Sequence, residues 1–191
     1  METQTKIQSI HSKEFKRYGY VVEKKFTELL DALAKTPRPN DDIVYKAAEE
    51  TLQATSDYKQ IQILFGGLEC QTGYCNGYNL PGTGQTEYHI GSEFILAEND
   101  ILLDISHRQE IENGKICSSK FETFRLSAGQ AVMLYETTLH HAPRSDGETC
   151  FRTVVGLLKG TNVGEPAAVV MDESNGVRMA NTNKWLLDID S

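Results

Sequence analysis

Three residues that can bind metals or move protons, Glu87, His89 and Glu93, are spaced as E-x-H-x3-E. Alternate side chains of an extended strand point to the same side, so all three can share one face. Burying such carboxylates inside a protein is costly unless a cation balances them, and a divalent metal ion would do so. The alternative is a polar strand at a sheet surface whose glutamates face water.

A second histidine, His140, closes a segment that begins at Gly129. The spacing of Gly129, Tyr135, Thr137 and His140 resembles the second cupin motif, in which these positions are glycine, proline, glycine and histidine. Tyr and Thr here replace the proline and the second glycine.

The E-x-H-x3-E pattern resembles the first cupin motif. Glu87 stands in the position of the first histidine, His89 in that of the second, and Glu93 in that of the glutamate. The resemblance implies a metal site made by Glu87, His89, Glu93 and His140.

Short segments spread over the chain resemble, more specifically, a bacterial domain-of-unknown-function family, number 4867, of single-domain cupin-like proteins. The segments are Gly73–Asn79, Glu87–His89, Thr137–His140 with Ala142-Pro143, Lys159–Asn162 and Asn183–Leu186. The resemblance runs from Ile10 to the C-terminal strand. It implies no settled activity, but it suggests a relation to cupin-like enzymes of carbohydrate metabolism such as sugar isomerases.

One divalent ion is therefore the expected cofactor. Two imidazoles with two carboxylates suit Mn, Fe, Ni or Zn better than Ca. Glu87 and Glu93 are also the candidate catalytic groups, since a carboxylate can shuttle a proton. His141 follows His140 directly and would point to the opposite face of a strand, so we do not expect it to be a ligand. We expect His11 and His107 to lie at the surface.

The segment Gly73–Asn79 is dense in groups that bind polar ligands. We expect Cys75, Asn76 and Asn79 to contact a carbohydrate, because the flanking glycines let the backbone approach a ligand closely. The alternative is a turn-rich loop whose side chains satisfy their own backbone. Cys75 as a nucleophile is the weaker interpretation, because most free cysteines are buried and inert.

Two further residues, Tyr135 and Lys159, are assigned to substrate binding. The Lys159 ammonium could hold a phosphate or carboxylate, whereas the alternative is a surface lysine at a strand end. The same surface interpretation applies to Lys184, which precedes Trp185.

The elements that must position these residues are mostly strands. Beyond Lys59, short runs rich in β-branched and aromatic residues alternate with Gly, Asn, Asp and Ser clusters. The expected strands are Ile61–Phe65, Tyr88–Leu96, Ile101–Ile105, Phe121–Leu126, Ala131–Tyr135, Phe151–Leu158, Ala168–Met171 and Trp185–Ile189. Many short strands without long helices between them predict a sandwich or barrel. Asn113-Gly114 predicts a hairpin turn.

The N-terminal part shows helical spacing instead. Apolar residues between Ser12 and Lys35 predict a turn and a helix separated near Gly19, and Ala47–Ala54 predicts a second helix. We therefore expect residues 1–58 to form a helical extension packed on a barrel of residues 59–191, within one structural domain.

Charge and composition exclude several classes of function. Lys and Arg number 19 against 27 Asp and Glu, a formal net charge of −8 among 191 residues, which disfavours binding to nucleic acid or anionic membranes. No apolar run is long enough to span a membrane, and Met1–Ser12 is too polar for a signal peptide. We expect a cytoplasmic protein whose cysteines, Cys70, Cys75, Cys117 and Cys150, are free thiols.

The sequence thus predicts a mainly β, cupin-like double-stranded β-helix, a jelly-roll barrel with N-terminal helical decoration. The expected function is that of a metal-dependent enzyme acting on a carbohydrate by proton transfer, as a sugar or sugar-acid isomerase, epimerase or lyase. The alternative is a non-catalytic sugar-binding or sensory cupin. Exposed sheet edges in small barrels favour a homodimer.

Overall fold

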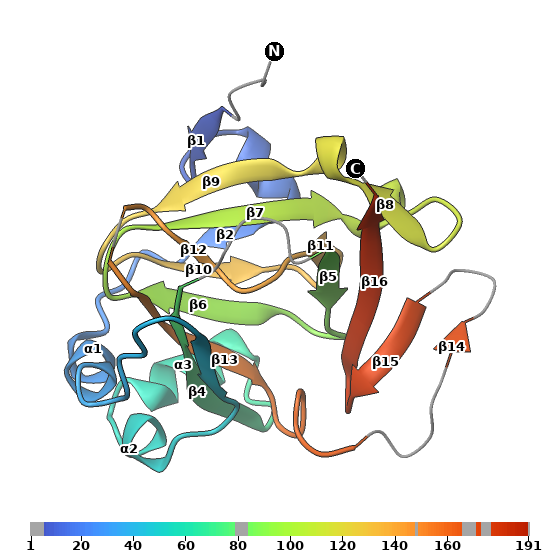
Figure 1. The fold of residues 1–191 in the computed structure, drawn as a ribbon. Coiled ribbons are helices and arrows are strands. Elements are labelled where there is room, and N and C mark those ends of the chain that lie inside the picture. Colours follow the sequence, from blue (N-terminus) through green and yellow to red (C-terminus); the bar gives the residue numbers. More distant parts are fainter. Residues whose placement is uncertain (1–5, 79–83, 148, 166–170, 173–176, 191) are drawn as a thin grey trace.

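Strands dominate the computed structural model, in which residues 6–78, 84–147, 149–165, 171–172 and 177–190 are described (Figure 1). They form three sheets. Two of these sheets face each other across a hydrophobic core, and the third lies at one end of them.

The largest sheet has the strand order β2-β10-β6-β13-β4-β3. Its strands are β2 Gly19–Val21, β3 Ile43–Lys46, β4 Cys70–Gly77, β6 Glu93–Ala97, β10 Ala131–Leu134 and β13 Phe151–Leu158. The facing sheet has the order β1-β9-β7-β11, and β12 also pairs with β7. Its strands are β1 Ile7–Ser9, β7 Ile101–His107, β9 Glu122–Leu126, β11 Thr138–Leu139 and β12 Arg144–Ser145.

The chain passes repeatedly between these two sheets. It crosses between β6 and β7, returns between β9 and β10, and does so again between β10 and β11 and between β12 and β13. Such alternation between two facing, mostly antiparallel sheets is a jelly-roll arrangement, which confirms the expected fold class.

The third sheet brings the C-terminal strand against a segment far away in sequence. Its order is β14-β15-β16-β5, and β8 also pairs with β16. The strands are β5 Gln85–Tyr88, β8 Lys115–Cys117, β14 Met171–Asp172, β15 Val177–Asn181 and β16 Lys184–Asp190. In Figure 1, β16 runs beside β5.

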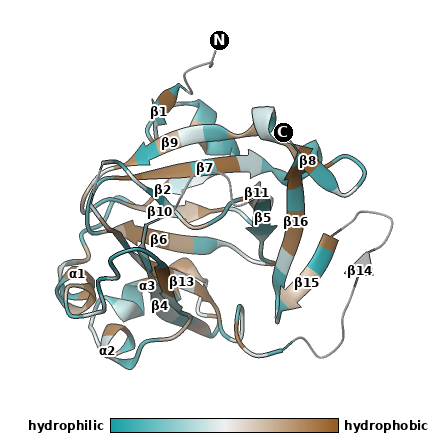
Figure 2. Cartoon of the chain, in the orientation of Figure 1, coloured by the Kyte–Doolittle hydropathy of each residue, from teal (hydrophilic) through white to brown (hydrophobic). Residues whose placement is uncertain are grey.

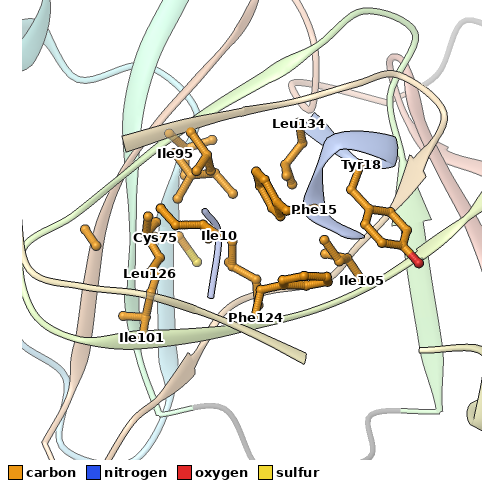
Figure 3. Close-up of a cluster of buried hydrophobic side chains, with 14 of the residues drawn as sticks. Ile10, Phe15, Tyr18, Cys75, Ile95, Ile101, Ile105, Phe124, Leu126 and Leu134 are labelled. Carbon is orange, nitrogen blue, oxygen red and sulfur yellow. The ribbon is translucent and has the colours of Figure 1, made fainter. Parts of the chain in front are cut away.

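Strict alternation decides which side chains face the space between the two packed sheets. In β6, Ile95 and Ala97 belong to the core between the sheets, whereas Phe94 and Leu96 face the helices on the other side. Figure 3 shows the inner cluster, and Figure 2 shows hydrophobic residues following the strands. Because Glu93 is two residues before Ile95, it too points inward.

Three short α-helices and three 3-10 turns complete the described part. The α-helices are α1 Thr27–Leu33, α2 Glu50–Gln53 and α3 Tyr58–Leu64, and the 3-10 turns span Glu14–Arg17, Arg108–Glu110 and Ser118–Lys120. The α-helices cover the outer face of the largest sheet and bury Leu29, Leu33, Leu52 and Ile61 against it.

The predicted strand Ile61–Phe65 is wrong, because most of this segment is helix α3. Ile61 and Phe65, four residues apart, are buried, whereas Ile63 between them is 68% exposed. That one-sided burial is helical, and a short apolar run does not distinguish it from a strand.

Among the other predicted elements, some are confirmed and others differ from the structure. Strands β7, β9, β10, β13 and β16 confirm five of the predicted runs. The N-terminal segment contains helix α1 but also contributes β1, β2 and β3 to the packed sheets. The expected strand Ala168–Met171 lies almost wholly outside the described residues. Asn113 and Gly114 both have positive φ, 51° and 77°, as the predicted hairpin turn requires.

All four cysteines are free in the structure. Within the described ranges, no helix has both the length and the apolar character needed to cross a membrane.

Candidate metal centre

Two strand ends bring the predicted ligands together. Glu87 lies in β5, while His140 follows β11, and the two residues form an isolated antiparallel bridge. Their backbones exchange hydrogen bonds of 2.7 Å from Glu87 N to His140 O and 2.9 Å from His140 N to Glu87 O. The side chains of Glu87 and His140 therefore start from adjacent positions.

A bend places the other two ligands. We expected Glu87, His89 and Glu93 on one continuous strand, but β5 ends at Tyr88 and β6 begins at Glu93. Gly91, with a φ of 98°, lies in the turn between them, where a left-handed backbone favours glycine. The three side chains converge across this bend.

The ligand atoms are close enough to share one ion. His89 Nε2 lies 3.8 Å from Glu87 Oε1 and 3.5 Å from Glu93 Oε2, and His140 Nε2 lies 2.8 Å from the same Glu93 oxygen. One ligand atom from each of Glu87, His89 and His140 falls within a 4.8 Å cluster. His89, Glu93 and His140 are buried.

Backbone carbonyls orient both imidazoles. His89 Nδ1 is 2.9 Å from the Asn183 carbonyl oxygen, and His140 Nδ1 is 3.1 Å from that of Thr138. Because a carbonyl oxygen only accepts hydrogen bonds, Nδ1 carries the proton in each ring. The Nε2 lone pairs are then free for a metal ion, the usual role of such contacts around metal-binding histidines.

Charges in the cluster shift the pKa values of its members. Burial lowers the pKa of His89. Burial also disfavours charge on His140, but the Glu93 carboxylate outweighs it and raises the pKa of His140 to about 9. For Glu93, burial alone would raise the pKa, and the neighbouring His140 lowers it instead. Without a bound cation, Glu93 and His140 are a buried pair of opposite charges.

The contact between Glu93 and His140 fits a shared metal ion better than a direct hydrogen bond. Glu93 Oε2 and His140 Nε2 are 2.8 Å apart, yet neither atom has a hydrogen-bond partner of acceptable geometry. Paired imidazoles and carboxylates are also a suitable donor set for Mn, Fe, Ni or Zn.

A cavity of about 190 Å³ opens onto the cluster. Its wall combines the four candidate ligands with further polar and apolar side chains. The lining residues are Ile43, Tyr45, Cys75, Glu87, His89, Glu93, Ile95, His140, His141, Ala142, Pro143, Val155, Leu157, Asn162 and Lys184. Such a mostly apolar, concave site with a few converging polar groups is typical of small-molecule binding.

Lys184 is a residue of the candidate site that sequence reasoning placed at the surface. It begins β16, lines the cavity rather than the outer surface, and sets its Nζ 2.5 Å from Glu87 Oε2. Local spacing gives no sign of this contact. It depends on the pairing of β16 with β5, in which Trp185 lies opposite Tyr88.

The predicted substrate-binding residues are scattered. Cys75 lines the cavity, but Asn76 is fully buried in β4, where its amide donates to Thr36 Oγ1 and to the Pro37 carbonyl. Tyr135 is half-exposed and packs beside Tyr20. Lys159 pairs with Glu69 at the surface, 3.0 Å away. Asn79 lies outside the described residues.

Cys75 and His141 also line the cavity, although His141 was expected to point to the face opposite His140. Burial, reinforced by the charges of Glu87 and Glu93, raises the pKa of the Cys75 thiol well above its usual value, which disfavours a nucleophilic thiolate. His141 lines the cavity next to His140, and both of its ring nitrogens are buried without a hydrogen-bond partner among the described residues.

Two facing sheets with a His/Glu cluster at one end of the space between them define a cupin-like, candidate metal-binding protein. Residues 7–191 match the family described as Domain of unknown function (DUF4867), and the chain belongs to this family. No curated protein matches the sequence.

Solved structures with a similar arrangement are remote. A Bacillus subtilis oxalate decarboxylase studied for its Mn(II) centres is 10% identical, with a TM-score of 0.35, over 51% of this chain and 24% of that one. The enzyme HppE, solved with Co(II) and Tris buffer, is 14% identical, with a TM-score of 0.37, over 64% of this chain and 56% of that one. The protein thus spans between a quarter and just over half the length of these solved chains.

Proposed function

We propose that this protein is a metal-dependent enzyme that moves a proton at a carbon beside the carbonyl group of a sugar or sugar acid. Isomerisation, epimerisation and elimination by a lyase all begin with such a proton transfer. The observation that carries the proposal is the cluster of Glu87, His89 and His140 at the cavity, with the buried Glu93 in contact with His140 but not hydrogen-bonded to it.

A divalent ion bound by these four residues would supply Lewis-acid polarisation of the substrate carbonyl. His89 and His140 hold their Nε2 atoms toward the centre through their backbone contacts. Glu93, whose pKa is lowered by His140, stays ionised and serves as a ligand. Because its pKa is lowered, the Glu93 carboxylate is a weak base and a poor proton acceptor.

Glu87 is the carboxylate placed to exchange the proton. Its Oε1 faces His89, and its Oε2 contacts Lys184. A second carboxylate in place of a histidine makes the site more anionic and any bound ion a weaker Lewis acid. A weaker Lewis acid slows a proton transfer less than it slows hydrolysis, which needs strong polarisation of the substrate. This supports isomerisation or epimerisation over hydrolysis.

Metal analysis and isotope exchange test the proposal together. Protein purified without added ions is expected to contain a first-row divalent metal by elemental analysis. Incubated with aldoses, ketoses, aldonates and uronates in deuterated water, the metal-loaded protein should introduce deuterium beside the carbonyl of its substrate, as seen by NMR.

Glu87→Gln should slow this exchange while the protein stays folded. Glu112→Gln, the same change in the hairpin that follows the Arg108–Glu110 turn, is the matched control and should exchange at the wild-type rate. Turnover without label would indicate a hydride shift. Bound metal without any turnover across the panel would support the non-catalytic sugar-binding alternative.

A further inference from the structure

Lys184 brings a positive charge to the cavity beside the metal-site residues. Among the described residues that line the cavity, it is the one lysine or arginine. Its side chain is 23% exposed, and its ammonium contacts Glu87 Oε2. The pairing of β16 with β5 fixes this position, because Trp185 lies opposite Tyr88 and stacks on it with ring planes 7° apart.

Once a divalent ion is bound, the negative charges of the site no longer balance the positive charge of the Lys184 ammonium. A divalent ion requires neutral histidines, because their Nε2 lone pairs must be free to bind it. The carboxylates of Glu87 and Glu93 then balance the two charges of the ion. Glu87 is shared between the ion and Lys184, so one positive charge of the cavity has no counter-charge of its own.

The surroundings make that charge costly unless a ligand supplies the missing anion. Ile43, Ile95, Val155 and Leu157 line the same cavity and offer no hydrogen bonds. A charge in a partly apolar, partly buried place is destabilising unless it is paired. A monoanionic ligand would complete the balance, and a carboxylate also accepts hydrogen bonds from an ammonium group.

We infer that the cavity selects substrates that carry a carboxylate, with that group facing Lys184 beside the metal centre. The inference rests on the proposed function and narrows it from sugars in general to sugar acids and related hydroxy or oxo acids. A neutral sugar would leave the ammonium charge uncompensated, and this difference is a source of specificity. One residual positive charge also matches a carboxylate better than a phosphate dianion.

Ligand binding to the Mn(II)-loaded protein tests the inference without knowledge of the substrate. Glycolate is the smallest hydroxy acid, ethylene glycol is its neutral counterpart, and inorganic phosphate is the competing anion. Each is titrated at constant ionic strength, and the melting temperature, the Mn(II) EPR spectrum and the calorimetric Kd are recorded. We expect glycolate to bind and raise the melting temperature, and ethylene glycol to have little effect at the same concentration.

Variants assign the effect to Lys184. Lys184→Met should weaken glycolate binding at least about tenfold, since a charge-assisted hydrogen bond and an ion pair are lost together. Lys184→Arg should keep part of the affinity. Lys115→Met removes the same charge from a surface lysine that pairs with Asp190, and should bind glycolate like the wild type. Elemental analysis confirms that each sample carries Mn(II).

The outcomes separate the two proposals. Failure to bind Mn(II) contradicts the proposed function itself. With Mn(II) bound, the carboxylate inference is overturned if glycolate does not bind, if ethylene glycol binds equally well, if phosphate binds more tightly, or if Lys184→Met keeps wild-type affinity for glycolate. The carboxylate inference is supported if glycolate binds the wild-type protein as expected and this binding is lost in Lys184→Met.

Discussion

His140 and His141 are neighbours in the chain, yet their ring nitrogens have different surroundings. His140 Nε2 lies 2.8 Å from Glu93, and its Nδ1 is held by the Thr138 carbonyl. His141 lines the cavity, but neither of its ring nitrogens has a hydrogen-bond partner among the described residues. We therefore predict that His140→Ala lowers metal affinity more than about a hundredfold, beyond the usual range for loss of an outer contact, whereas His141→Ala keeps metal content near that of the wild type.

Metal content of the two variants after dialysis, measured by elemental analysis, checks this prediction. Circular dichroism confirms that both remain folded. Equal losses in the two variants would contradict the assignment of His140 as the ligand.

A second residue-scale prediction concerns Asp104 in β7. Its carboxylate accepts hydrogen bonds from Arg144 and, at 2.6 Å, from Thr123 Oγ1. Burial alone would raise its pKa, but the Arg144 and Thr123 contacts lower it. A lowered folded-state pKa contributes stability that is fully present above the unfolded value, about 3.9, and is lost as the pH falls through the folded value.

Asp104→Asn should therefore cost about 1.5–3 kcal/mol of unfolding free energy at pH 7, and the difference from wild type should shrink below about pH 4. Chemical denaturation at several pH values measures it. Asp146→Asn removes a carboxylate that pairs with the exposed Arg125, so it should cost under about 1 kcal/mol. A difference for Asp104→Asn that stays constant down to pH 2 would argue against the ionised pair.

At the scale of elements, the turn between β15 and β16 contacts the candidate metal centre through His89. Asn183 has a φ of 57°, and its carbonyl accepts from His89 Nδ1. Its side-chain Oδ1 accepts a hydrogen bond from Ile90 N, and its Nδ2 donates to Ile90 O. The same Nδ2 also donates to Thr161 Oγ1 at 2.8 Å. One residue thus fixes both His89 and the bend that follows it.

Asn183→Gly keeps the left-handed backbone but removes these side-chain bonds. We predict a loss of metal affinity of about tenfold, the lower end of the usual range for outer contacts. Asn113→Gly is the matched control, because Asn113 also has a positive φ of 51° but lies in a surface hairpin. Competitive metal titration measures both, and equal affinities for the two variants would contradict a supporting role for Asn183.

Elements also show what the sequence could and could not predict. Strands such as β7 and β13 were predictable, because runs of β-branched residues between turn residues are typical of strands. Helix α3 was not, since Ile61–Phe65 is too short to reveal its period. The contact of Lys184 with Glu87 was equally hidden, because no local pattern specifies that β16 pairs with β5.

For the molecule as a whole, the metal ion should contribute to stability. An ion that binds only the folded chain stabilises it by about 2.7 kcal/mol at a free concentration one hundred times its Kd. For a protein of this size, that corresponds to a fall in melting temperature of about 5–10 °C after chelation. Calorimetry of the metal-containing protein before and after EDTA treatment checks it, with re-addition of metal to restore the midpoint. An unchanged midpoint would exclude a stabilising contribution.

The pairing of β16 with β5 also sets when the centre can be completed. Gln85–Tyr88 and Trp185–Asp188 are far apart in the chain, and contacts of this kind form slowly because a long loop must close first. Synthesis from the N-terminus delivers β6, β7, β9, β10 and β13 to the ribosome exit before β16. The packed sheets can therefore form while Lys184 and the Asn183 carbonyl are still missing. Tight metal binding at the candidate site would then follow docking of β16 against β5.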